Sequence, residues 1–122
     1  ADGTTEAAAK LEELALAVQI LGKWSTGGLQ KRQILRDKRL EQMVDILGKH
    51  ARSMEPWALV SSIRGLARVG GAWECAPALL DAARTRLGEF NVEQLALLLR
   101  CIAEGQELRG LKPATQLRDA IV

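Results

Sequence analysis

The feature that most constrains this chain is a repeat with a period of 36 residues. Segment 54–69 aligns with segment 90–105 over its whole length. Within the first segment, Leu59, Ile63 and Leu66 are spaced i, i+4, i+7, which places them on one face of a helix. Repeats of this length are typically pairs of helices that bury an apolar face only against neighbouring pairs, so the period predicts a stack of helix–turn–helix units.

The segments between these helices repeat as well, which indicates two kinds of helix in alternation. Segment 43–47 matches 79–83 at an offset of 36, and 79–83 matches 117–121 at an offset of 38. An Asp stands at the same place in all three segments, and we expect these residues to cap or salt-bridge neighbouring units. They are Asp45, Asp81 and Asp119.

Composition agrees with a wholly helical chain. Ala, Leu, Glu and Arg are abundant, whereas the residues that favour strands are scarce, with no Tyr and one Phe. We therefore predict an all-α fold, a right-handed α-solenoid that forms a single domain over 1–122. We expect the chain to be a processed or partial piece of a longer one, because it ends within a helical pattern. The predicted A helices are 5–22, 55–69 and 91–104, the predicted B helices are 38–51, 73–87 and 113–122, and the units are 5–51, 55–87 and 91–122, the last truncated.

The first unit is longer than the others. Its A helix aligns with the second A helix at an offset of 48, whereas the B helices keep an offset of 36. About a dozen residues are therefore inserted between the first A and B helices, at 25–36, and the insertion is basic. Insertions in solenoids lie at one rim and often make the specific contacts, so we expect binding residues here.

Charge points to RNA through its distribution. The net charge is only +2, but residues 23–52 hold eight basic residues against three acidic ones, a local excess of five. Such a cluster attracts phosphates through counterion release. Arg64 and Arg100 recur at one repeat position, and we expect them to form a ladder with Arg68; the alternative is that they are ordinary surface residues. The candidate RNA-binding residues are Lys31, Arg32, Arg36, Lys38, Arg39, Arg64, Arg68 and Arg100.

No set of residues predicts catalysis or metal binding. His50 is the only histidine, and it falls at the C-terminal end of a B helix, where a cation suits the helix dipole. Cys75 and Cys101 are far apart and resemble small core residues. Gly27 and Gly28 lack the spacing of a phosphate-binding loop. We expect a protein that is not an enzyme, with no cofactor, no metal, no small-molecule substrate and no membrane span.

The tryptophans have two possible uses. Trp24, Trp57 and Trp73 fall at the ends of predicted A helices. Tryptophan can stack on nucleic-acid bases, but repeat proteins commonly use large residues at such positions to pack one unit on the next. We therefore expect core packing.

Segments 55–70 and 90–105 resemble the first helix of octotricopeptide and heptatricopeptide repeats. The likeness lies in an aromatic residue, a short polar turn, a Leu-Ala-x-x-Leu pattern that ends near Gly, and a period of 36–38. The resemblance implies an organellar RNA-binding protein of the kind that often ends in a RAP domain, with relatives among the structural parts of mitochondrial ribosomes. Ile63 and Leu99 stand where those repeats have a tryptophan, which favours scaffolding over base-specific reading.

These observations together predict a non-catalytic RNA-binding and scaffolding component of an organellar ribonucleoprotein, such as a mitochondrial ribosome. The expected partners are the backbone of ribosomal RNA and the neighbouring proteins of a large complex. The expected location is the mitochondrion, with a plastid or the cytoplasm as alternatives. The alternative function is a protein–protein adaptor of the armadillo or HEAT type that makes no RNA contact.

Overall fold

The structure is a computed structural model that describes residues 2–24, 32–34, 36–70, 74–105, 108 and 110–122. Within these residues every regular element is helical, which confirms the all-α prediction. The predicted A and B helices are all present, with ends within a few residues of those expected. They are α1 (Asp2–Trp24), α3 (Lys38–Lys49), α4 (Pro56–Val69), α5 (Ala76–Thr85), α6 (Val92–Glu104) and α8 (Lys112–Ile121), with short 3₁₀ helices η1 (Ala51–Ser53) and η2 (Leu87–Glu89).

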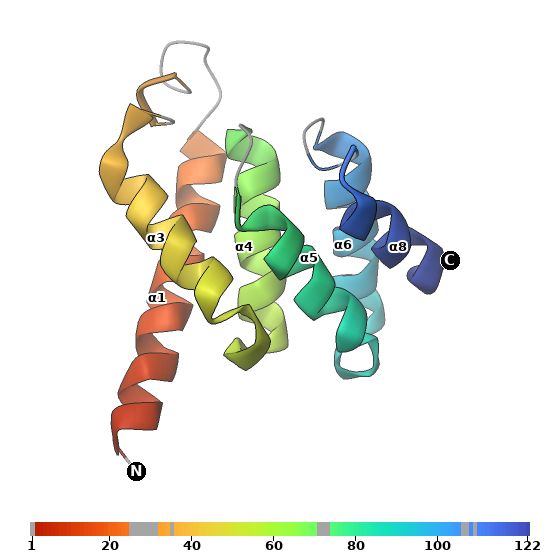
Figure 1. Ribbon diagram of the computed structural model, residues 1–122, viewed down its shortest axis with the longest axis horizontal. Coiled ribbons are helices and arrows are strands. Elements are labelled where there is room, and N and C mark those ends of the chain that lie inside the picture. The colour runs from red at the N-terminus through yellow and green to blue at the C-terminus, as the bar shows by residue number, and fades with distance from the viewer. Residues whose placement is uncertain (1, 25–31, 35, 71–73, 106–107, 109) are drawn as a thin grey trace.

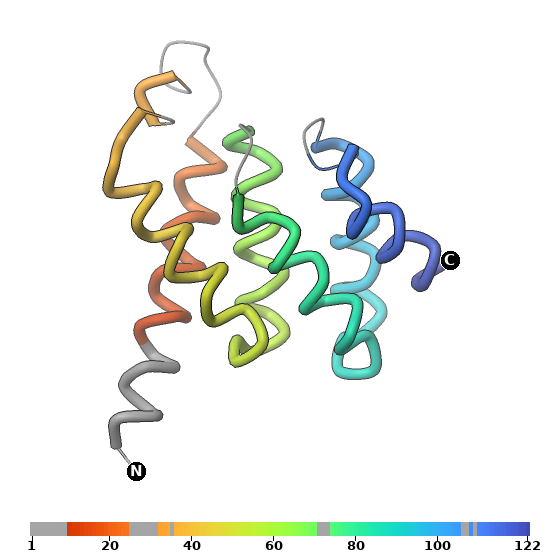
Figure 2. The backbone as a smooth tube through the Cα atoms, viewed as in Figure 1, coloured from red at the N-terminus to blue at the C-terminus, as the bar shows by residue number. Residues whose placement is uncertain are grey.

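The helices lie in two layers (Figure 1). The predicted A helices α1, α4 and α6 lie side by side in one layer, and the predicted B helices α3, α5 and α8 cross them in the other. Within the layers, α1 packs on α4, α4 on α6, and α5 on α8. Between the layers, α1 contacts α3, α4 contacts α5, and α6 contacts α8. The backbone trace in Figure 2 shows the same alternation along the chain.

Helix α4 lies at the centre of the core. It packs against α1, α5 and α6, and its buried residues include Leu59, Ile63 and Leu66, the face predicted from their spacing. Pro56 stands in its first turn, where a missing backbone N–H costs nothing. Gly70 ends the helix with φ of 79°, a left-handed conformation that glycine adopts without strain.

The start of α6 is fixed by a capping box. The Asn91 side chain accepts a hydrogen bond from the Gln94 backbone N–H at 2.8 Å, and the Gln94 side chain accepts one from the Asn91 N–H at 2.9 Å. Two N–H groups that the helix itself cannot satisfy are thereby paired. An Asn directly before the first helical residue is a usual signal of such a cap in a sequence.

Helices α1 and α4 approach so closely that their backbones touch. A Cβ built at Gly65 would lie 2.5 Å from the Val18 carbonyl oxygen, and one at Gly22 would lie 3.0 Å from the Gly65 carbonyl oxygen. Only residues without a side chain fit this crossing, which sets the distance between the first two A helices.

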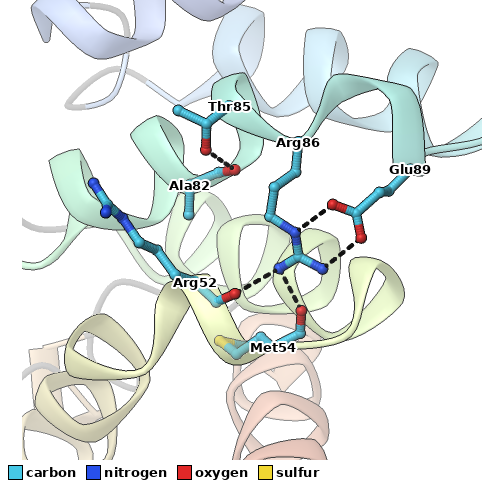
Figure 3. Close-up of polar contacts among 6 residues, drawn as sticks. All are labelled: Arg52, Met54, Ala82, Thr85, Arg86 and Glu89. Atoms are coloured by element: carbon cyan, nitrogen blue, oxygen red, sulfur yellow. Dashed lines mark hydrogen bonds and ion pairs between the residues drawn. The ribbon is translucent and has the colours of Figure 1, made fainter.

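Arg86 joins the ends of two successive B helices (Figure 3). Its Nη1 donates to the carbonyl oxygens of Met54 at 2.6 Å and Arg52 at 3.3 Å, which follow α3. Its Nε and Nη2 donate to the Glu89 carboxylate at 2.8 and 3.0 Å, and this pairing raises the pKa of Arg86. The Arg86 side chain is only 18% exposed, whereas Glu89 is 53% exposed, so the hydrogen bond to Met54 is better shielded from water than the ion pair with Glu89.

The repeated Asp residues do not hold units together as expected. Asp81 pairs with Arg84 at 2.7 Å within α5, and Asp119 pairs with Arg118 at 3.3 Å within α8, because each has an arginine nearby on its own helix. Asp45 is exposed on α3.

The expected core packing of the tryptophans is wrong for those that the structure describes. Trp24 is 66% exposed at the end of α1, and Trp57 is 37% exposed in the first turn of α4. Neither side chain belongs to the buried core. Trp73 lies outside the described residues.

Candidate anion-binding interface

The predicted basic cluster is only partly within the described residues. Arg32, Arg36 and Lys38 have exposed side chains, whereas Lys31 lies outside the described residues. The insertion itself, predicted at 25–36, also falls mainly outside them.

Arg39 is committed to a neighbouring carboxylate. Its Nη2 lies 2.7 Å from Oδ2 of Asp37 and its Nε donates to Oδ1 at 3.0 Å, while the Arg39 backbone N–H donates to the same Oδ1 at 2.9 Å. Asp37 thus caps α3, and the Arg39 hydrogen bonds lower the pKa of the Asp37 carboxyl to about 2. This cap was not predicted, although an Asp directly before the first helical residue is its usual signal in a sequence.

The arginines of the ladder predicted from the repeat do come together. Arg64 and Arg68 on α4 and Arg100 on α6 all line a single cavity of about 210 Å³ between these helices, which we call the arginine cleft. The remaining lining residues are Ala67, Leu97, Cys101 and Glu104.

The arginine cleft holds uncompensated positive charge. Arg100 pairs with Glu104 at 3.0 Å, one turn along α6. The side chains of Arg64 and Arg68 make no hydrogen bond or ion pair with another described residue, so two of the three arginines that line the cleft have no carboxylate partner among these residues. Three arginines against one glutamate leave a net charge of +2 in this cavity.

Apolar and buried side chains also line the arginine cleft. Cys101 is 5% exposed there, beside Ala67 and Leu97. Burial raises the pKa of the Cys101 thiol to about 11, although the charges of Arg64, Arg68 and Arg100 all oppose that rise. The three arginines therefore lie close enough to act on one buried group, although the Arg100 side chain itself is 67% exposed and its charge is screened by water.

The first unit has a second cavity and, on α1, a row of exposed apolar side chains that we call the apolar row. The cavity, of about 280 Å³, is lined by Leu21, Ile34, Asp37, Arg39, Leu40 and Met43. The row consists of Leu16, Ile20 and Trp24, which are exposed at successive turns of α1. This apolar row was not predicted, although its i, i+4, i+8 spacing is visible in the sequence.

Other kinds of site find no support in the part of the chain that the structure describes. No three His, Cys, Asp or Glu side chains there gather in a way that could hold a metal ion, and both Cys75 and Cys101 are free thiols. No described helix is long and apolar enough to cross a membrane. Finally, no protein-family model, curated protein or solved structure matches this chain.

Proposed function

We propose that this protein is a non-catalytic RNA-binding scaffold. The observation that supports this most is the arginine cleft, where Arg64 and Arg68 have no acidic partner among the described residues and Arg100 joins them from the next A helix. Arginine is suited to phosphate because its planar guanidinium can donate two parallel hydrogen bonds to a pair of phosphate oxygens.

The proposal includes a right-handed α-solenoid of about three helix pairs. Its support is the alternation of α1, α4 and α6 with α3, α5 and α8 between two layers, together with the 36-residue period. In such a stack, equivalent positions of successive units project along the same surface. A polyanion that crosses α4 and α6 would then meet one guanidinium group after another.

The mechanism that we propose is backbone recognition. Phosphates would displace counterions from the arginine cleft and from the exposed residues Arg32, Arg36 and Lys38. Contacts of this kind position an RNA without reading its bases. They suit a component of an organellar ribonucleoprotein, such as a mitochondrial ribosome, whose RNA is already folded and held by other proteins.

Fluorescence anisotropy with a labelled single-stranded RNA, measured across a salt series, tests the proposal. The double variant Arg64→Gln/Arg68→Gln should weaken binding and flatten the salt dependence by roughly one unit of slope for each phosphate that is no longer neutralised. Lys112→Gln, which removes an exposed charge at the start of α8, is the matched control and should change affinity little. Absence of salt-dependent RNA binding by the unchanged chain, or equal binding by the double variant, would refute the proposal.

The second candidate function is a protein–protein adaptor, and the exposed apolar row of Leu16, Ile20 and Trp24 favours it. Exposed apolar side chains at successive turns of a helix are typical of a surface that another protein covers. Purification of the native assembly with and without ribonuclease separates the two functions. An adaptor keeps its protein partners after RNA digestion and loses them with Ile20→Asp, whereas an RNA scaffold is released by the digestion.

A further inference from the structure

The arginine cleft differs from an ordinary basic surface because its charges come from two helices and lie beside a buried residue. Arg64 and Arg68 belong to α4 and Arg100 to α6, and the buried Cys101 lines the same cavity. A cavity of about 210 Å³ that is lined by arginines from two helices can hold one compact anion, such as a single phosphate group.

The charge of the cleft matches a particular kind of phosphate. Its net charge of +2 comes from three arginines and Glu104. An internal phosphodiester of RNA carries a single negative charge, whereas a phosphomonoester carries about −1.5 to −2 near neutral pH and offers three terminal oxygens. Three guanidinium groups therefore pair more completely with the three oxygens of a monoester than with the two free oxygens of a diester.

We propose that the arginine cleft is a receptor for one terminal phosphate group, held by Arg64, Arg68 and Arg100. The identification of its source as the 5′-phosphate of an RNA rests on the proposed function; a small phosphorylated molecule offers the same group. In either case the recognised chemistry is that of a phosphomonoester dianion.

Glu104 sets the selectivity of this receptor. It lies 3.0 Å from Nε of Arg100 and lines the same cavity, so it holds one guanidinium group while the cleft is empty and repels an incoming anion. A diester with one negative charge is attracted too weakly by the arginines to displace this carboxylate, whereas a dianion is attracted more strongly. Replacement of Glu104 by Gln should strengthen phosphate binding and narrow the preference for the monoester.

The experiment follows the arginine side-chain Nε–H signals of the intact chain by NMR during titration with inorganic phosphate. We expect saturable shifts of Arg64, Arg68 and Arg100, and binding that strengthens as the pH rises through the second pKa of inorganic phosphate, where the dianion forms. Arg64→Gln and Arg100→Gln should each weaken binding about tenfold or more, Glu104→Gln should strengthen it, and Lys112→Gln should leave it unchanged. Circular dichroism of each variant verifies that its helices are intact.

Matched RNA oligonucleotides with a 5′-phosphate and a 5′-hydroxyl then identify the source. Tighter binding of the 5′-phosphate RNA, with the difference abolished by Arg100→Gln, supports an RNA end as the ligand. Saturable binding of inorganic phosphate without binding of either RNA supports the receptor for a small phosphomonoester and refutes the RNA function. Equal binding of both RNAs, both weakened in Arg64→Gln/Arg68→Gln, refutes the terminal-phosphate receptor and leaves the RNA function standing. Shifts of the arginine Nε–H signals that do not saturate with inorganic phosphate, or that are not confined to the three arginines of the cleft, also refute the receptor.

Discussion

The guanidinium group of Arg86 donates a 2.6 Å hydrogen bond to the carbonyl oxygen of Met54, a residue 32 positions earlier in the chain. The same side chain is held from the other side by Glu89, three residues later. One arginine thus ties the turn that follows α5 to the turn that follows α3, and a carboxylate fixes its orientation.

Removal of this bridge should destabilise the protein. Arg86→Ala leaves the Met54 carbonyl oxygen without its charged donor, and a hydrogen bond to a charged group contributes about 2 kcal/mol. Arg86→Lys should recover only part of the loss, because an ammonium group lacks the planar fork that reaches both Met54 and Glu89. Urea unfolding followed by circular dichroism measures the difference. Arg84→Ala, which breaks an exposed pair within α5, is the control and should cost no more than roughly 0.5 kcal/mol. Equal losses in Arg86→Ala and Arg84→Ala would contradict the bridge.

A methyl group at Gly65 should disrupt the crossing of α1 and α4. The added Cβ would lie 2.5 Å from the Val18 carbonyl oxygen and 2.7 Å from its carbon, and backbone atoms cannot move aside as a flexible side chain can. We expect Gly65→Ala to lower the free energy of unfolding by about 1–3 kcal/mol, the usual cost of overpacking. Thermal unfolding compared with Gly88→Ala, whose new Cβ meets nothing within 4 Å, checks this. A Gly65→Ala protein as stable as Gly88→Ala would show that the two helices separate at little cost.

Acid should weaken the N-terminal end of α3. The pKa of Asp37 is lowered from its ordinary value of 3.8 to about 2, chiefly by the Arg39 side-chain hydrogen bond. The stabilisation from Asp37 is therefore complete above pH 3.8 and is lost as the pH falls through about 2. Carbon-detected NMR of the Asp37 carboxyl group should give a midpoint near 2, and Arg39→Gln should move that midpoint upward. A midpoint near 3.8 in the unchanged protein would contradict the contact.

The two thiols should react slowly in the folded protein. Burial, and to a smaller extent the negative charge of Asp45, raises the pKa of Cys75 to about 11. Burial also raises the pKa of Cys101 to about 11. Since the thiolate is the reactive form, alkylation by iodoacetamide at pH 8 should be about a hundredfold slower than for an ordinary thiol of pKa 9. Mass spectrometry of the protein in buffer and in urea measures both rates. Comparable rates in the two solvents would place the thiols in contact with water.

Local pattern accounts for the features that were predicted correctly from the sequence. The spacing of Leu59, Ile63 and Leu66 encodes the buried face of α4, and the period places Arg64 and Arg100 at equivalent points of adjacent helices. Both features depend only on helical geometry and on repetition. The all-α fold, the helix ends and the gathering of these arginines therefore followed from the sequence.

Interactions between distant residues account for the features that were not predicted. The partner of Arg86 is a backbone carbonyl 32 residues away, and no side-chain pattern records it. Trp24 was expected in the core because it is large and apolar, but its exposure depends on whether another element covers the end of α1. The pairs of Asp81 and Asp119 are an exception, because their partners lie nearby on their own helices, and repeat position alone does not determine this choice.

Leu16 and Ile20 precede Arg64 and Arg68 by 48 residues, the same offset that relates the first A helix to the second. Helices α1 and α4 are neighbours, and the Cβ of Arg68 would lie 3.1 Å from a Cβ built at Gly22. Corresponding positions are thus apolar on α1 and positively charged on α4. A ligand that spans both helices would meet apolar side chains on α1 and arginines on α4. Only one of its two orientations would then match this surface.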